Sequence, residues 1–158
     1  QPYSSIISKK NMIDLKCTYC PDKIGCKKDN CPIDKMVAEI SEMQDFLEIT
    51  ASDNPTELLS RLTDLNVYLA RSGKLLADAK AIQDILTANI FDSKGEYISR
   101  LSTTLASKFI TSQTATINQI VTWLDRINRT CVHQSDNIRT QISFAKMEKA
   151  NINRGVGI

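Results

Sequence analysis

Residues 54–90 of the chain read NPTELLSRLTDLNVYLARSGKLLADAKAIQDILTANI. Asn54 can accept a hydrogen bond at a helix N-cap, Pro55 suits the first helical position, and Glu57 can reach back to the cap. Behind this start, apolar residues recur at spacings of four and three, with two polar interruptions. These residues are Leu58, Leu62, Leu65, Leu69, Leu76, Ala79, Leu86 and Ile90. Such a seam, about five heptads long, is typical of a coiled coil or of one arm of a long helical hairpin.

The segments on both sides of this seam also have helical patterns. Pro32 can open a first turn, and the apolar residues after it recur at every third or fourth place. They are Ile33, Met36, Val37, Ile40, Met43, Phe46 and Leu47. After the seam, FDSKGE at residues 91–96 predicts a break, because Ser93 and Glu96 have the spacing of a second capping box.

A third long helix is predicted from about Lys94 to Ala150. The residues expected on its inner face are Ile98, Leu101, Leu105, Phe109, Ile120, Leu124, Ile127, Cys131, Ile138, Ile142 and Ala145. The run TSQTAT at residues 111–116 is weakly apolar and poor in helix formers, so it predicts a kink or a short interruption there.

The predicted fold is all-α. Two long helices joined by a short turn must lie antiparallel, and the shorter N-terminal helix can cover their groove. We therefore expect a long antiparallel helical hairpin with this shorter helix, a three- or four-helix bundle over residues 32–150. Arms of this length leave apolar seam that three helices do not cover. Either self-association or a third helix that folds back to give a fourth would cover it.

Composition is consistent with one helical domain. The chain has 158 residues, 42% hydrophobic and 24% charged, close to the globular average. The net charge of +2 is unevenly spread: residues 1–35 hold seven lysines and four aspartates, and residues 126–158 hold six basic and two acidic residues. The stretch between them is acidic, so the ends would meet any polyanion, or the gradient would simply be a solvated surface.

Four cysteines lie close together near the N-terminus. Cys17, Cys20, Cys26 and Cys31 have the spacing C-x2-C-x5-C-x4-C. Four thiolates can close a tetrahedral structural zinc site, and metal ligation would order a loop that has little apolar surface to bury. Two disulfides or an iron–sulfur cluster are the alternatives. Residues 17–31 are therefore predicted to form a small metal loop after an N-terminal arm, residues 1–16, and residues 151–158 a flexible tail.

The spacing of these cysteines resembles the zinc knuckle of retroviral nucleocapsid-type proteins, C-x2-C-x4-H-x4-C. Cys26 stands where the knuckle has histidine, and the preceding loop is one residue longer. The resemblance implies a structural zinc ion, and it suggests single-stranded nucleic acid as a ligand. The residues that would contact it are Lys16, Tyr19, Lys23, Lys27, Lys28 and Lys35.

Two further segments resemble a group of small, uncharacterised helical proteins of tailed phages and prophages. They are YLARSGKLLADAK, residues 68–80, and VTWLDRINRTCVHQSDNIRTQIS, residues 121–143. The resemblance implies a phage setting and no mechanism. The chain has no run of 18 apolar residues, and its first residues lack the pattern of an export signal. We therefore expect an intracellular protein of the host cytoplasm, free or associated with the virion, and no membrane contact.

No motif for catalysis stands out, so we expect no enzymatic activity and no small-molecule substrate. Trp123, Arg126, Arg129 and His133 are candidate partner-binding residues; for Trp123 the alternative is core filling, and for the others a solvated face. The function expected is a zinc-binding assembly or adaptor protein, phage-encoded, that self-associates or docks into a phage complex. The alternative is a single-stranded nucleic-acid-binding accessory in phage replication, recombination or packaging.

Overall fold

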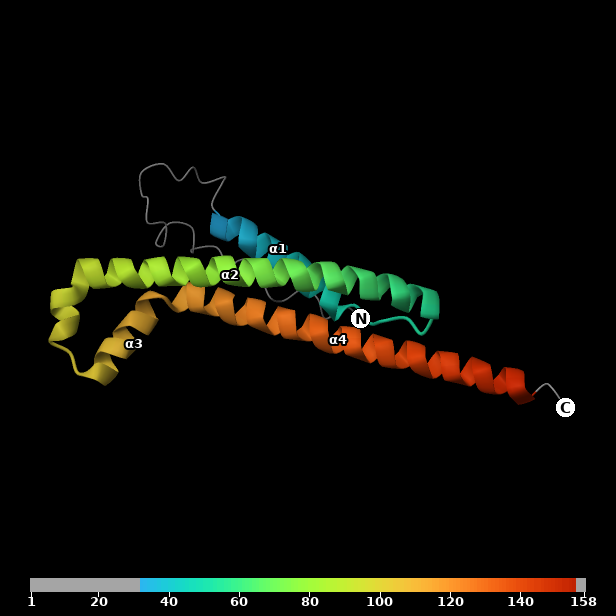
Figure 1. Ribbon diagram of the computed structural model, residues 1–158. Coiled ribbons are helices and arrows are strands. Elements are labelled where there is room, and N and C mark those ends of the chain that lie inside the picture. The colour runs from blue at the N-terminus through green and yellow to red at the C-terminus, as the bar shows by residue number, and fades with distance from the viewer. Residues whose placement is uncertain (1–31, 156–158) are drawn as a thin grey trace, which may run out of the picture.

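The computed structural model describes residues 32–155, and all regular structure in that part is helical. The helices are α1 (Pro32–Glu48), α2 (Pro55–Ser99), α3 (Thr103–Gln113) and α4 (Ala115–Gly155). The long helices α2 and α4 run antiparallel side by side, α1 packs across them, and α3 lies at one end of the pair (Figure 1). The predicted all-helical fold is confirmed for these residues. The predicted arm and metal loop, residues 1–16 and 17–31, lie outside them.

None of the described helices has the length and apolar composition needed to cross a membrane.

The start of α2 confirms the predicted cap at Asn54. Its side-chain Oδ1 accepts a hydrogen bond from the backbone N–H of Thr56 at 3.0 Å, and Pro55 occupies the first helical position. The predicted return contact from Glu57 is wrong. The backbone N–H of Asn54 instead donates to Ser52 Oγ at 3.1 Å, so a residue before the helix satisfies this donor.

The core of the hairpin follows a heptad pattern. Five of the seven buried residues of α2 recur at every seventh position, and Leu75 and Ile98 are the other two. The five are Leu58, Leu65, Ser72, Ala79 and Leu86. The matching residues of α4 are Ile117, Ile120, Leu124, Ile127, Cys131 and Ile138, and α1 adds Ile33, Met36, Ile40, Met43 and Leu47. Full burial of one such aliphatic side chain contributes about 1.5–3 kcal/mol, so this seam holds the three helices together. The predicted inner faces of α1 and α4 are confirmed at these positions.

Two polar pairs interrupt this apolar seam. Asn128 on α4 donates through Nδ2 to Ser72 Oγ at 3.0 Å and to the carbonyl of Leu69 at 3.2 Å. Nearer α3, Gln83 Nε2 donates to Asn118 Oδ1 at 2.5 Å. We refer to these two contacts as the polar layers. Each one aligns a residue of α2 with a particular residue of α4, so together they set the register of the hairpin.

The helix end predicted at residues 91–96 is wrong, because α2 continues to Ser99. Its last turns bend away from the rest of the helix (Figure 1). Ser93 does not cap a new helix. Its hydroxyl donates back to the carbonyl of Asn89 at 2.7 Å, a bond that a serine inside a helix can make. The chain turns instead after Arg100, and Ser102 caps α3 by accepting from the N–H of Leu105 at 3.4 Å.

The interruption predicted at residues 111–116 is confirmed at Thr114. This buried residue ends α3, and both its backbone N–H and its hydroxyl donate to the carbonyl of Ile110. The predicted third helix is therefore two helices, α3 and α4. The predicted inward position of Leu105 is wrong, since the residue is exposed. None of the residues of α3 is fully buried. At the other end, α4 continues past the predicted boundary at Ala150 to Gly155.

The C-terminal part of α4 runs beyond the start of α2 (Figure 1). Arg61 on α2 contacts Gln134 on α4, and α2 begins six residues before Arg61. Both helices rise about 1.5 Å per residue, so α2 starts opposite roughly residue 140 of α4. We call residues 143–155 the α4 projection. Its large apolar residues Phe144, Met147 and Ile152 are exposed.

Candidate functional site

Most of the residues predicted to bind metal or nucleic acid lie outside the described part of the chain. These are the four cysteines Cys17, Cys20, Cys26 and Cys31, and the nucleic-acid candidates Lys16, Tyr19, Lys23, Lys27 and Lys28. Of the set, only Lys35 is described, as an exposed residue in the first turn of α1. The zinc site and its alternatives therefore stay predictions from the sequence.

Within residues 32–155, no three histidine, cysteine, aspartate or glutamate residues come together as metal ligands. Cys131 is fully buried in the seam of α4, as the heptad spacing predicts. Burial raises the pKa of its thiol, so the neutral form is favoured. The residue therefore acts as a small apolar core residue.

Trp123 joins α1 to α4. Its indole Nε1 donates to Gln44 Oε1 of α1 at 3.1 Å, and its ring packs half-buried against the core. This arrangement matches the core-filling interpretation of the tryptophan. One edge of Trp123 also borders an open hollow of about 500 Å³ on α4, lined by Ala115, Asn118, Gln119, Thr122, Trp123 and Arg126.

The other three candidates on α4 lie on its outer surface. Arg126, Arg129 and His133 are all exposed, and helical spacing places them along one strip. Arg129 Nε forms an ion pair with Asp125 Oδ2 at 3.0 Å, which reduces the local positive charge. The structure therefore groups these three side chains on one side of the helix, and only Trp123 packs against the core.

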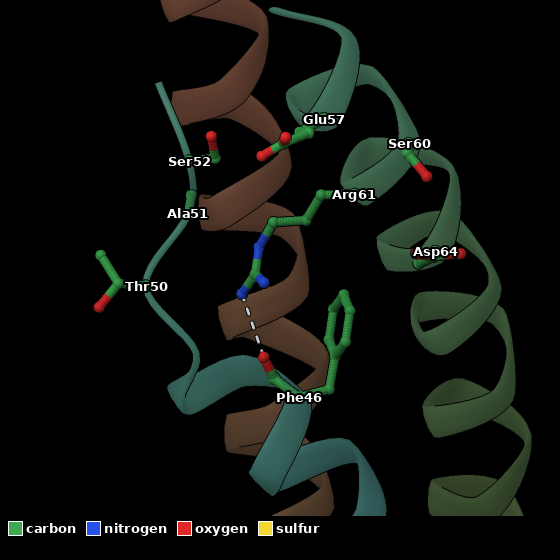
Figure 2. Close-up of a pocket in the computed structure, with 8 residues that line it drawn as sticks. All are labelled: Phe46, Thr50, Ala51, Ser52, Glu57, Ser60, Arg61 and Asp64. Carbon is green, nitrogen blue, oxygen red and sulfur yellow. Dashed lines mark hydrogen bonds between the residues drawn. The ribbon is translucent and has the colours of Figure 1, made fainter. Parts of the chain in front are cut away.

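A second cavity lies where α1 connects to α2 (Figure 2). It has a volume of about 300 Å³ and is lined by Phe46, Thr50, Ala51, Ser52, Glu57, Ser60, Arg61 and Asp64. The guanidinium of Arg61 lies between the ring of Phe46 and the connecting segment (Figure 2), 4.5 Å from the ring centroid. Carboxylates and a guanidinium share this cavity, so its charge is mixed.

Arg61 links three helices at this point. Its Nη2 donates to the carbonyl of Phe46 at 3.1 Å and to Gln134 Oε1 at 3.1 Å. Gln134 in turn donates through Nε2 to the carbonyl of Leu47 at 2.9 Å. The last carbonyls of a helix lack hydrogen-bond donors within that helix. Here Arg61 of α2 and Gln134 of α4 donate to the last carbonyls of α1. Arg61 Nε is buried without a partner among the described residues.

Around this cavity the protein surface is strongly acidic. Residues 42–64 carry six carboxylates and one arginine. All six carboxylates are exposed, and none forms an ion pair within residues 32–155; they are Glu42, Asp45, Glu48, Asp53, Glu57 and Asp64. We call residues 42–64 the acidic end, because they lie at the end of the hairpin from which α4 projects.

The sequence predicts the apolar seam but does not predict that residues 42–64 form one acidic surface. The charge count did show an acidic middle of the chain. It could not show that the C-terminus of α1 and the start of α2 fold together, since that depends on Arg61 and Gln134 contacting α1 from far along the sequence. Arg61 itself gave no signal, because it reads as a polar residue on the outer face of an amphipathic helix.

Comparisons of the chain with protein-family models, with curated proteins and with solved structures found no match.

Proposed function

We propose that this protein is a non-enzymatic assembly or adaptor protein, phage-encoded, that uses its helical hairpin to hold other proteins and its N-terminal four-cysteine loop to bind a structural zinc ion. The observation that carries the proposal is the shape of the hairpin. Helices of 45 and 41 residues lie side by side, and the second extends past the first with exposed apolar residues. A helix that leaves its own fold offers a ready surface to a partner.

The negative charge of α1 makes nucleic acid a less favoured partner than protein. This helix carries five acidic residues and one lysine, Lys35. It follows directly after the cysteine loop, so a phosphate backbone bound at the loop would meet this negative charge. A protein partner has no such constraint.

The partner class is tested by photo-crosslinking in the host during phage growth. A photo-reactive amino acid is placed at the exposed positions Val67, Ile85 and Phe144, and at buried Leu65 as the matched control. We expect discrete adducts from the exposed positions and none from Leu65. Adducts that survive nuclease and disappear with protease support a protein partner. Adducts that disappear with nuclease, or no adducts at all, contradict the proposal.

The zinc part of the proposal has its own test. Metal analysis of the purified full chain should give one zinc ion per chain, lost when Cys17 and Cys20 are both replaced by serine and unchanged in Cys131→Ser. Iron with a visible absorption band, or no metal, would contradict it. The crosslinking result does not depend on this measurement, so either part can fail alone.

A further inference from the structure

The α4 projection is a basic helix with exposed apolar side chains, and it packs on no other helix of residues 32–155. Phe144, Met147 and Ile152 are 66%, 62% and 59% exposed. The exposed Lys146 and Lys149 lie between them in the sequence, on the side of the helix that Ile152 shares and away from Phe144 and Met147. Residues 143–155 carry three basic and one acidic residue. Large apolar side chains exposed together on one helix indicate an interaction surface.

The acidic end has the complementary charge. Its six exposed carboxylates against one arginine give residues 42–64 a net charge of −5, whereas the projection has +2. The acidic end also exposes two large apolar residues, Ile49 at 61% and Leu59 at 58%. Both surfaces therefore combine apolar side chains with charge, and their charges are opposite in sign.

Within one chain these two surfaces do not cover each other. The projection leaves the hairpin beside the acidic end and runs straight away from it (Figure 1). A second copy related by a twofold axis would place its own acidic end beside the projection of the first. Two such contacts form at once in this arrangement, because a twofold interface uses the same pair of surfaces twice.

We propose that two copies of this chain associate end to end, with the α4 projection of each docked on the acidic end of the other. This inference rests on the proposed assembly function and names the first partner as the protein itself. Lys146 and Lys149 face the carboxylates of Asp45 and Glu48. Ile152, three residues after Lys149 and on the same side of the helix, packs toward the apolar side chains Ile49 and Leu59. The projection, about 20 Å long at 1.5 Å per residue, is long enough to reach along the acidic end.

The test uses sedimentation equilibrium of the full chain at low and high salt. The charge reversals Lys146→Glu and Lys149→Glu, made together, should raise the dimer Kd about tenfold or more, because they set like charges against each other. Asp45→Lys with Glu48→Lys should do the same. All four changes together restore opposite charges, and the Kd should return to within about threefold of the wild-type value.

The matched control reverses two exposed lysines far from the projection, Lys80→Glu and Lys108→Glu, which change the net charge equally. It should leave the Kd unchanged. Circular dichroism checks that each variant keeps its helical content. A monomer at all concentrations overturns the inference, and so does a dimer that the reversals at Lys146 and Lys149 leave intact.

Two further readouts separate this inference from the proposed function. A photo-reactive amino acid at Ile152 should crosslink to residues 42–64 of the second copy in the purified protein. If the protein is a monomer that still crosslinks to another protein in the host, the proposed adaptor function stands and the proposed dimer is overturned. If the protein is a monomer that co-floats with phosphatidylserine vesicles in a density gradient, the basic projection binds a membrane and the inference is overturned.

Discussion

At the scale of single residues, Arg61 is the side chain on which three helices depend. Its guanidinium supplies a donor to the end of α1, contacts α4 through Gln134 and lies over the ring of Phe46. Nothing in its sequence neighbourhood distinguishes it from an ordinary exposed arginine. The close packing of α1 on the hairpin therefore depends on a polar residue as well as on the predicted apolar faces.

Replacing Arg61 with methionine should lower the free energy of unfolding by about 2 kcal/mol, because two hydrogen bonds from a charged donor, to the carbonyl of Phe46 and to Gln134, are lost. Urea unfolding followed by circular dichroism measures this. Arg100→Met is the control, since the Arg100 side chain pairs with exposed Glu96 and with no other residue of 32–155. If the two substitutions lower the free energy of unfolding equally, the proposed role of Arg61 in holding α1 on the hairpin is contradicted.

The thiol of Cys131 should resist alkylation in the folded protein. Burial raises its pKa from the ordinary value of 9.0, so the reactive thiolate is scarce. The unfolded chain releases this proton more readily, so the contribution to stability is complete below about pH 9 and is lost as the pH rises through the folded pKa. Peptide mapping after timed labelling should show Cys131 modified only on unfolding. Rapid modification in native buffer would contradict its burial.

At the scale of helices, the length of α2 is the main departure from the sequence prediction. The hydroxyl of Ser93 can cap a new helix or bond back within the same helix, and both choices satisfy it. Buried Ile98 favours continuation, because the helix that runs past residue 96 removes this side chain from water. Local spacing alone cannot reveal that burial. The seam of α2, the cap at Asn54 and the interruption at Thr114 were predictable because each follows from local chemistry.

The substitution Gly95→Ala tests this continuity. A β-carbon at residue 95 meets no atom within 4 Å, so alanine should raise the free energy of unfolding by about 0.5–1 kcal/mol, as in any helix interior. Gly73→Ala is the comparison, since its β-carbon would touch only Asn128 Nδ2, at 3.7 Å. Thermal and urea unfolding provide the measurement. A loss of stability at residue 95 would show that the helix does not pass through it, in line with the break that the sequence predicts.

The pairing of α1 with α2 should weaken in acid. Hydrogen bonds and charge from Arg71 lower the pKa of Glu39, and those from Glu39 raise the pKa of the Arg71 guanidinium. The two hydrogen bonds, from Arg71 Nε and Nη2 to the Glu39 carboxylate, are both 2.6 Å long. A lowered carboxyl pKa stabilises the fold above the unfolded value of 4.5, and that contribution is lost as the pH falls through the folded pKa. Both side chains keep a third to a half of their surface exposed to water, which screens the pair, so the change in stability is small.

Thermal unfolding of wild type and Glu39→Gln between pH 7 and pH 3 measures this effect. The difference in Tm should be a few degrees at most near neutral pH and should vanish below the folded pKa of Glu39. Asp84→Asn is the control, because exposed Asp84 forms no ion pair within residues 32–155. A difference between wild type and Glu39→Gln that stays constant with pH would contradict the proposed ion pair.

At the scale of the whole molecule, residues 32–155 form an elongated structure (Figure 1). The helix α2 measures about 68 Å along its path at 1.5 Å per residue, although its last turns bend away from its long straight part, and the projection of α4 extends the other end. A compact domain of this chain length would have a radius of gyration of about 15 Å. The candidate metal and nucleic-acid residues, Lys35 apart, lie before α1, so neither this dimension nor the fold of residues 32–155 tests them.

Small-angle X-ray scattering of the monomer at low concentration and high salt should give a radius of gyration of about 22–26 Å, as expected for a rod of roughly 85 Å. Deleting residues 147–158 should shorten the maximum dimension without loss of thermal stability, because residues 147–153 are exposed along the whole of their length. A value near 15 Å would mean that α4 folds back on the hairpin in solution.

The polar layers also restrict how the two long helices can slide. A shift of α4 by one heptad would return most of its aliphatic side chains to an equivalent apolar neighbour, and apolar contact alone would largely tolerate it. The amide of Asn128 would then face Leu65 or Ala79 in place of Ser72, losing that hydrogen bond at about 1–3 kcal/mol, and Gln83 would lose Asn118. The hairpin therefore has one alignment, and the reach of its C-terminal tip is the same in every copy.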